Sequence, residues 1–120
     1  MTLLTVYRAS EALGGLYRNE HLTAREAYGI MKLRAALRED AAFFIQRRNE
    51  LLRRHGEPDE ENPGRYCFPD VEKMKAFEAS VKELADTETN VKYDPVTLRG
   101  EIEGVTPETL EALEGFVGVT

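Results

Sequence analysis

The chain of 120 residues has little of the chemistry on which most enzymes depend. It contains one cysteine, Cys67, two serines and two histidines, and the histidines, His21 and His55, stand more than thirty residues apart. A single cysteine cannot form an internal disulfide, which agrees with a reducing compartment. These residues match no zinc-site spacing, and neither serine lies in a nucleophile elbow. We therefore expect no catalytic residues, no metal and no cofactor, and hence a protein that is not an enzyme.

Long apolar runs are also missing. No stretch approaches the roughly 18 apolar residues that span a bilayer, and the start of the chain, Met1 to Val6, has neither a basic n-region nor a long apolar h-region. These absences predict a soluble protein without a signal peptide or a membrane partner. Hydrophobic residues make up 42% of the chain and charged residues 32%. This balance is typical of one helical domain, so we treat residues 1–120 as a single domain.

The clearest positive signal is an amphipathic helix from Thr23 to His55. Thr23 and Glu26 have the spacing of a capping box, and Gly56 with Pro58 beyond it marks the end. Apolar residues repeat every seven positions along the helix, at Ile30, Leu37, Phe44 and Leu51. Such a helix is about 45–50 Å long, which exceeds the diameter of a compact domain of this size. We expect a second helix, another chain, or both, to cover it.

A second helix is predicted to return along the first. Three prolines and two glycines between Gly56 and Pro69 predict a reversal of the chain. Asp70 can then cap a helix from Val71 to Ala85. The apolar stripe of this helix is expected to face the long helix, in a register that places two residues of the long helix against two of the shorter one: Leu37 and Phe44 against Phe77 and Val81.

The remaining segments predict shorter elements. A first helix of about twelve residues is expected to begin at Thr5 as its cap and to fray or bend at Gly14-Gly15. Strand-forming residues around Tyr66 and around Val91 predict a small sheet element. Thr106 caps a last helix, predicted from Pro107 to Phe116. The predicted fold class is therefore α+β, mostly α: a long-helix antiparallel hairpin with an N-terminal helix, a small β element and a short C-terminal helix.

Charge is distributed unevenly along a chain whose net charge is −6. Residues 23–55 hold eight basic and four acidic groups, whereas residues 56–120 hold six basic and sixteen acidic groups. We expect the basic helix to lie beside the acidic elements of the same fold, in exposed pairs worth ~0–1 kcal/mol each. The alternative is a nucleic-acid contact along the arginines. The acidic balance and the lack of interleaved aromatic residues disfavour that alternative.

Self-association is a further expectation drawn from the long helix. The flanking helices are shorter, so part of the long helix would stay uncovered off its main apolar seam. The candidate interface residues there are Phe43, Ile45, Arg48 and Leu52. A two-fold dimer of antiparallel long helices would bury this flank and could bring arginines and acids of opposite copies together.

Several short runs resemble a family of small uncharacterised proteins encoded by tailed bacteriophages and prophages. They include His55 to Glu60, Gly64 to Tyr66, Val91 to Tyr93 and Val105 to Glu108, and the similarity extends from about residue 20 onward. The resemblance implies a phage gene product made in the cytoplasm of a bacterial host, with association with the virion left open. It implies no established activity and no catalytic or ligand residues.

These observations together favour a non-enzymatic small phage protein that acts through protein–protein contacts, in assembly or regulation. The expected partner is a phage or host protein, with a homodimer as a further possibility. Two alternatives stay open. The first is a host-interference protein that binds and inhibits a bacterial enzyme or defence component, and the second is a nucleic-acid-binding protein that uses the basic helix.

Overall fold

The computed structural model describes all residues, 1–120, and is organised around one long helix, α2 (Ala24–His55). The Thr23 hydroxyl accepts a hydrogen bond from the Glu26 amide (3.1 Å), and the Glu26 carboxylate accepts one from the Thr23 amide (2.8 Å). The predicted capping box and the predicted end of the helix before Gly56 are both confirmed. No helix of the structure combines the length and the apolar character needed to cross a membrane.

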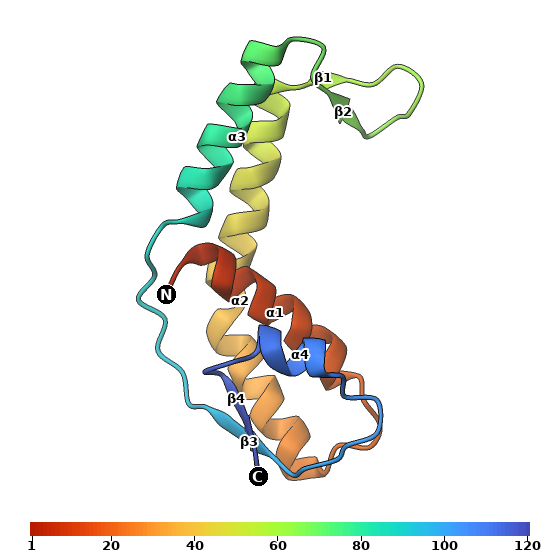
Figure 1. Cartoon of the computed structure of the whole chain (residues 1–120), viewed down its shortest axis with the longest axis vertical. Coiled ribbons are helices and arrows are strands. Elements are labelled where there is room, and N and C mark those ends of the chain that lie inside the picture. Colours follow the sequence, from red (N-terminus) through yellow and green to blue (C-terminus); the bar gives the residue numbers. More distant parts are fainter.

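Two shorter helices pack on different halves of α2 (Figure 1). Helix α1 (Leu3–Tyr17) crosses the N-terminal half, and α3 (Val71–Ala85) returns beside the C-terminal half after its predicted cap, Asp70. The resulting molecule measures 50 × 32 × 21 Å and has a radius of gyration of 17.3 Å. A compact chain of this length would have a radius of roughly 14 Å. The protein is therefore elongated along α2.

The first helix differs from its prediction at both ends. Its cap is Thr2 rather than Thr5, because the Thr2 hydroxyl accepts the Thr5 amide (3.3 Å) and the chain at Thr2 bridges to Glu88. The helix also continues through Gly14-Gly15 to Tyr17. Leu16 is buried beyond the glycines, and its packing outweighs the ~1 kcal/mol that each glycine costs in a helix.

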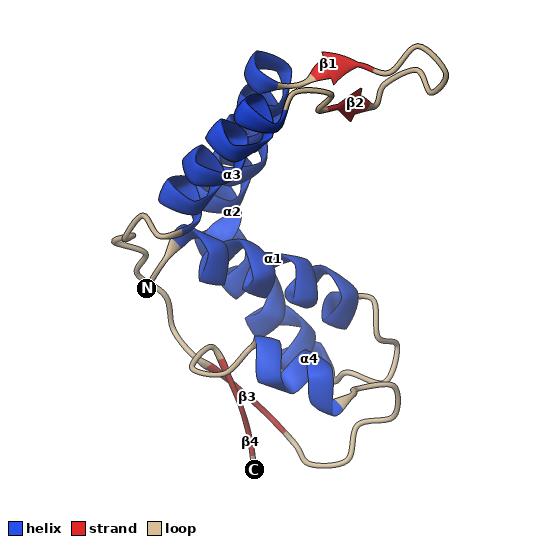
Figure 2. Ribbon diagram, turned by 45° about the horizontal axis from the view of Figure 1, so that its top comes forward, coloured by secondary structure: helices blue, strands red, loops and turns tan.

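Two small sheets complete the fold. Strands β1 (Glu57–Pro58) and β2 (Tyr66–Cys67) form an antiparallel hairpin that projects from the end of α2 (Figure 2). The hairpin loop is closed by Asp59, whose pKa is held below its ordinary value by hydrogen bonds from the Asn62 side chain and the Glu61 amide. Strands β3 (Val96–Leu98) and β4 (Val117–Val119) pair in parallel. The Tyr66 part of the predicted sheet is thus confirmed, and β3 is a short strand at the end of the predicted Val91 region.

The C-terminal predictions need two corrections. The segment from Val91 to Tyr93 is not a strand, because it has no pairing partner and instead packs its side chains on the core, with the Tyr93 ring 4.8 Å from that of Phe116. Helix α4 (Pro107–Ala112) begins after Thr106 as predicted but ends before Phe116. Gly115 then adopts a left-handed φ of 87°, and this turn redirects the chain into β4.

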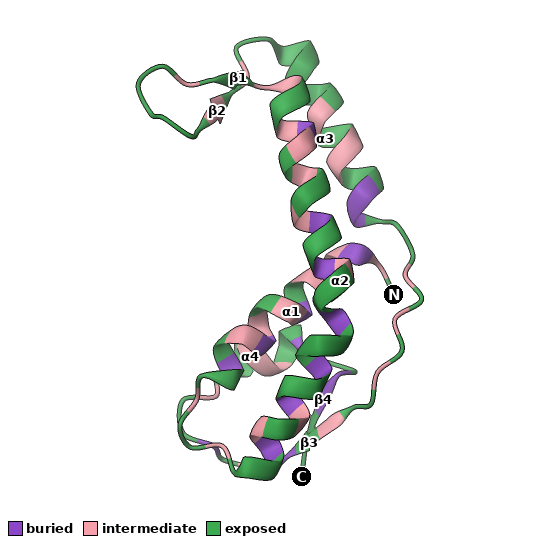
Figure 3. Cartoon of the chain, turned by 180° about the vertical axis from the view of Figure 1, so that it is seen from behind, coloured by how far each residue is buried: buried purple, intermediate pink, exposed green.

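The buried residues form two separate cores (Figure 3). We call the first region the body: α1, the N-terminal half of α2, β3, β4 and α4. Its core holds twelve residues, among them Leu13, Leu37 and Phe116. The second region, the arm, contains the C-terminal half of α2, α3 and the β1–β2 hairpin. Its core holds five residues, one of them contributed by the first turn of α1: Leu3, Phe44, Leu51, Leu84 and Ala85.

The two cores correct the predicted helix register. Phe77 and Val81 of α3 do pack on the arm core that contains Phe44. Leu37, however, lies in the body core with residues of α1. Helix α1 rather than α3 covers α2 at that level, so only half of the predicted register is correct.

Candidate functional site

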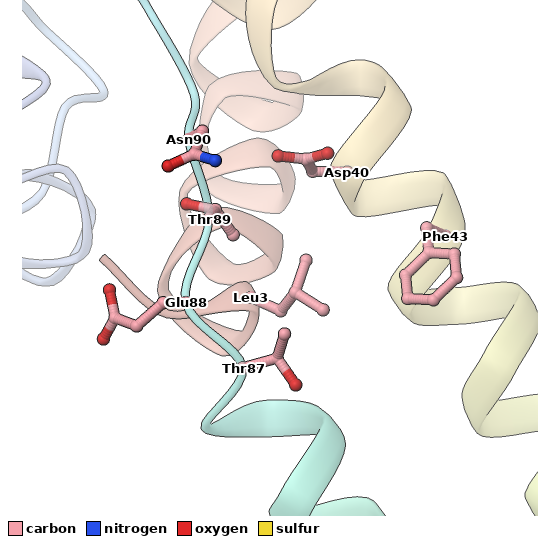
Figure 4. Close-up of a pocket in the computed structure, with 7 residues that line it drawn as sticks. All are labelled: Leu3, Asp40, Phe43, Thr87, Glu88, Thr89 and Asn90. Carbon is pink, nitrogen blue, oxygen red and sulfur yellow. The ribbon is translucent and has the colours of Figure 1, made fainter.

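Two adjoining clefts follow one side of the arm and share Phe43 and Thr87. The first has a volume of about 370 Å³ and is shown in Figure 4; its lining residues are Leu3, Asp40, Phe43, Thr87, Glu88, Thr89 and Asn90. The second has a volume of about 300 Å³ and lies between α2 and α3; its lining residues are Phe43, Arg47, Leu51, Arg54, Ser80, Glu83, Leu84 and Thr87. We call the two clefts together the Phe43 groove.

The apolar part of the groove follows from the position of Phe43 on α2. Successive residues of a helix point about 100° apart, so Phe44 enters the arm core while Phe43 emerges beside it with 51% of its surface exposed. Leu3, Leu51 and Leu84 are buried beneath the groove. In Figure 4 Leu3, at the start of α1, and Phe43, on α2, lie on different sides of the first cleft. The groove therefore has an apolar floor and one exposed aromatic wall.

The opposite wall is the segment from Thr87 to Asn90, and backbone hydrogen bonds fix its position. The Leu3 amide donates to the Thr87 carbonyl (2.9 Å), and the Thr89 amide donates to the Met1 carbonyl (2.9 Å). The amino group of Met1 also pairs with the Glu88 carboxylate at 3.0 Å. This wall is thus held against the start of α1 by contacts within the chain.

Some charged groups at the rim of the groove form ion pairs within the chain and others do not. Arg47 pairs with Glu50 at 2.9 Å, within α2. Asp40, Glu83 and Arg54 form no ion pair within 4.0 Å. Asp40 lies at one end of the groove and Arg54 toward the other, and the unpaired Glu83 lines the same cleft as Arg54. The rim therefore offers an unpaired acid at one end and an unpaired base with an acid in the second cleft.

The groove brings together few groups that could carry a reaction. Ser80 and two threonines are its hydroxyl groups, and it contains no histidine or cysteine. Nowhere in the chain do three His, Cys, Asp or Glu side chains gather as a metal site would need. That the protein is not an enzyme and holds no metal stays a prediction from its sequence.

The four candidate interface residues do not form one surface. Ile45, Arg48 and Leu52 share one side of α2 and are half-buried, whereas Phe43 lies on the other side of the apolar seam, in the groove. The Arg48 guanidinium stacks over the rings of Tyr7 (5.4 Å) and Phe44 (5.7 Å). All four residues lie off the apolar seam of α2, as predicted, but on two different sides of it.

The basic helix does lie beside elements of the acidic segment, since α3 and β3 pack on α2, but the ion pairs predicted between them are absent. No ion pair within 4.0 Å joins a basic residue of α2 to an acid of residues 56–120, and the one ion pair between these regions has the reverse sense, Arg99 with Glu26 (3.5 Å). The other elements pack on α2 through apolar faces, which leaves most of its charges outside. Arg34 instead stacks over Tyr17 at 5.3 Å.

Glu26 is the one buried charged residue, with 7% of its surface exposed. Its carboxylate accepts the Thr23 amide (2.8 Å) and the Arg99 amide (3.0 Å). These two backbone hydrogen bonds, the one from Thr23 first, hold the pKa of Glu26 below its ordinary value. The capping-box pattern predicted the first bond. The second links α2 to the residue after β3, which no local pattern shows, and it makes Glu26 a structural clamp of the body.

Comparison with known proteins adds no family to this description. No family model matches the chain, and no curated protein and no solved structure is significantly similar to it.

Proposed function

We propose that the protein is non-enzymatic and acts through protein–protein contacts, with the Phe43 groove as the binding site for its partner. The observation that carries the proposal is the half-exposed Phe43 ring above a floor of buried leucines, next to charges that the chain leaves unpaired. Aromatic residues in such apolar surroundings supply much of the binding energy of protein interfaces. Isolated exposed apolar residues are ordinary, but here the ring is part of a groove.

The shape of the groove suggests the form of the partner. From Asp40 to Arg54 it follows α2 over fourteen residue steps, or about 21 Å. An amphipathic helix of about four turns has this length and would lay its apolar side against Phe43 and Leu84. The unpaired Arg54 and Asp40 favour a partner helix with an acidic group near the former and a basic group near the latter.

The resemblance to phage proteins supports a role in phage assembly or regulation, in the cytoplasm of an infected bacterium. The partner would then be a phage protein, or a host protein if the chain acts by interference. Lysates of infected and uninfected bacteria separate these two sources, because a phage partner is present only in the first.

Site-specific photo-crosslinking tests the proposal. A benzoylphenylalanine at position 43 should yield a discrete cross-linked product in lysate, whereas the same residue at position 119 should not. Val119 is a matched control because 49% of its surface is exposed and it lies in the body, away from the groove. Arg54→Glu should weaken the product at position 43. Equal products from both positions, or none from position 43, would contradict the proposal.

Nucleic-acid binding is the alternative that salt dependence tests. The basic residues of α2 point in several directions, and Arg34, Arg47 and Arg48 are engaged by side chains of the same protein. We therefore expect no binding of duplex DNA or RNA that weakens steeply with salt. Such binding, together with its loss in an Arg53→Glu variant, would favour the nucleic-acid alternative instead.

A further inference from the structure

The outer side of α2 carries a second heptad pattern besides the one that faces the cores. One row begins at Tyr28 and repeats every seven residues: Tyr28, Ala35, Ala42 and Asn49. A second row lies three positions further on: Met31, Arg38, Ile45 and Leu52. Alternating steps of three and four residues, sustained over four heptads, are the pattern of a coiled-coil seam. We call the two rows together the outer seam; six of its eight residues are apolar.

The outer seam is largely uncovered, because six of its residues are exposed and only Ile45 and Leu52 are half-buried. Its first row lies two residues, or about 200° around the helix, from the core-facing row that begins at Ile30. Tyr28 is 61% and Met31 41% exposed, and no residue of the seam is buried. From Tyr28 to Leu52 the seam extends over about 36 Å.

We propose that the outer seam pairs with the outer seam of a second copy of this chain, as an antiparallel coiled coil. Its two-fold axis crosses α2 at the height of Asp40 along the helix, on the side away from the Phe43 groove that Asp40 lines. This register sets small residues against large ones: Ala35 faces Ile45 of the second copy, and Ala42 faces Arg38. A parallel pair would instead place Arg38 against itself and leave each alanine facing an alanine. Like charges at a seam position are unfavourable, so the sequence selects the antiparallel arrangement.

Charge complementarity around the axis identifies a second copy as the occupant. Arg38 and Glu39 are exposed and neither forms an ion pair within its own chain. In the antiparallel register, Arg38 of one copy lies about 4.5 Å along the axis from Glu39 of the other, and the two Glu39 residues, about 3 Å apart along it, are flanked by the two arginines. The two-fold axis repeats this pair, so four charges of balanced sign meet at the centre of the seam. This self-association goes beyond the proposed function because it uses a different side of α2 from the Phe43 groove.

Light scattering coupled to size exclusion measures the association directly. The mass should rise from 13.6 kDa toward twice that value as concentration increases. Arg38→Glu should weaken the dimer roughly tenfold or more, because it places like charges at the axis. The double variant Arg38→Glu with Glu39→Arg should restore it by reversing both signs. Both residues are exposed, so circular dichroism should show the same helix content in all three proteins.

Disulfide trapping tests the orientation. In a Cys67→Ser background, the combination of Ala35→Cys and Ile45→Cys should give a covalent dimer on oxidation, since these positions face each other. Ala35→Cys alone should not, because the two copies of that residue lie about 15 Å apart along the axis, beyond the reach of a disulfide. A covalent dimer from the single variant would indicate a parallel pair and overturn the proposal.

Two further results would overturn the proposal: a mass of 13.6 kDa at every concentration, or a dimer whose affinity Arg38→Glu leaves unchanged. The cross-link at position 43 should be the same in the Arg38→Glu variant as in the unmodified protein. Failure of the dimer and failure of the groove are therefore distinguished by separate measurements.

Discussion

The body and the arm share α2, but they differ in how far they bury the shorter helix that packs on it. Helices α1 and α3 both have 15 residues, yet α1 buries five of them, while α3 buries only Leu84 and Ala85 at its end. Helix α1 is enclosed by α2 and α4, whereas α3 has α2 as its main neighbour (Figure 1). The body therefore buries more of its shorter helix than the arm does, and α3 of the arm stays largely exposed.

The largest expected effect tests whether the body is the main source of stability. Phe116→Ala removes a ring that is 1% exposed and should lower the free energy of unfolding by about 3–5 kcal/mol. Phe43→Ala is the matched control, because it removes the same ring from the groove and should change stability by only ~0.5 kcal/mol. Urea unfolding of the two variants measures both values. A similar loss of unfolding free energy in both variants would show that Phe43 contributes to stability as a core residue does.

The next prediction tests whether the arm unfolds separately. Phe44→Ala opens the arm core, where the ring packs at 4.8 Å from that of Tyr7, and should cost about 3 kcal/mol. Amide hydrogen exchange should show lost protection in α3 and retained protection in α4. An unchanged melting temperature would place Phe44 on the surface. Equal loss of protection in α3 and α4 would show that arm and body form one cooperative unit.

A smaller effect is expected at the clamp between α2 and β3. Glu26→Gln should cost about 1–2 kcal/mol at neutral pH, since it weakens hydrogen bonds to a buried carboxylate. The pKa of Glu26 is lowered in the folded protein from its ordinary value of 4.5. Its stabilisation is therefore fully present above pH 4.5 and is lost as the pH falls through the lower folded-state pKa.

Unfolding measured from neutral to acidic pH checks this sign. The difference in stability between Glu26→Gln and the unmodified protein should shrink as the pH falls below 4.5. A constant difference would show that the carboxylate charge does not contribute, and that the variant acts through packing alone.

The smallest expected effect is that of a chelator. Because no group of three His, Cys, Asp or Glu side chains is placed to hold a metal in the body or the arm, a chelator should leave the melting temperatures of both unchanged. A large fall would show a bound metal and would direct attention first to the acidic run Glu57 to Glu61.

Local signals in the sequence predicted the helices better than they predicted their neighbours. The caps at Thr23, Asp70 and Thr106 depend on residues within three positions, and all three were predicted correctly. Thr2 and Thr5 offer equivalent local chemistry for the first cap. The choice between them is made by the pairing of Thr2 with Glu88, far away in the chain.

In the candidate site, too, local features could be predicted from the sequence and contacts between distant segments could not. Phe43 was predicted to lie off the main seam, and it does. Its groove, however, is completed by Leu3 and by the segment from Thr87 to Asn90, which are distant in sequence from α2. The parallel pairing of β3 with β4 likewise joins segments about twenty residues apart, and no periodicity in either strand specifies it.

The body core is assembled from both ends of the described chain, and this has a consequence for folding during synthesis. Leu13 and Phe116 belong to the same core, although about a hundred residues separate them. At ~5–20 residues per second, roughly 5–20 s pass between the synthesis of α1 and that of β4. The α1–α2 and α2–α3 contacts join neighbouring helices and can form in that interval. The apolar side of α1 and α2 then stays exposed until the segment from Val96 to Val117 is synthesised. That segment packs on it last and completes the body core.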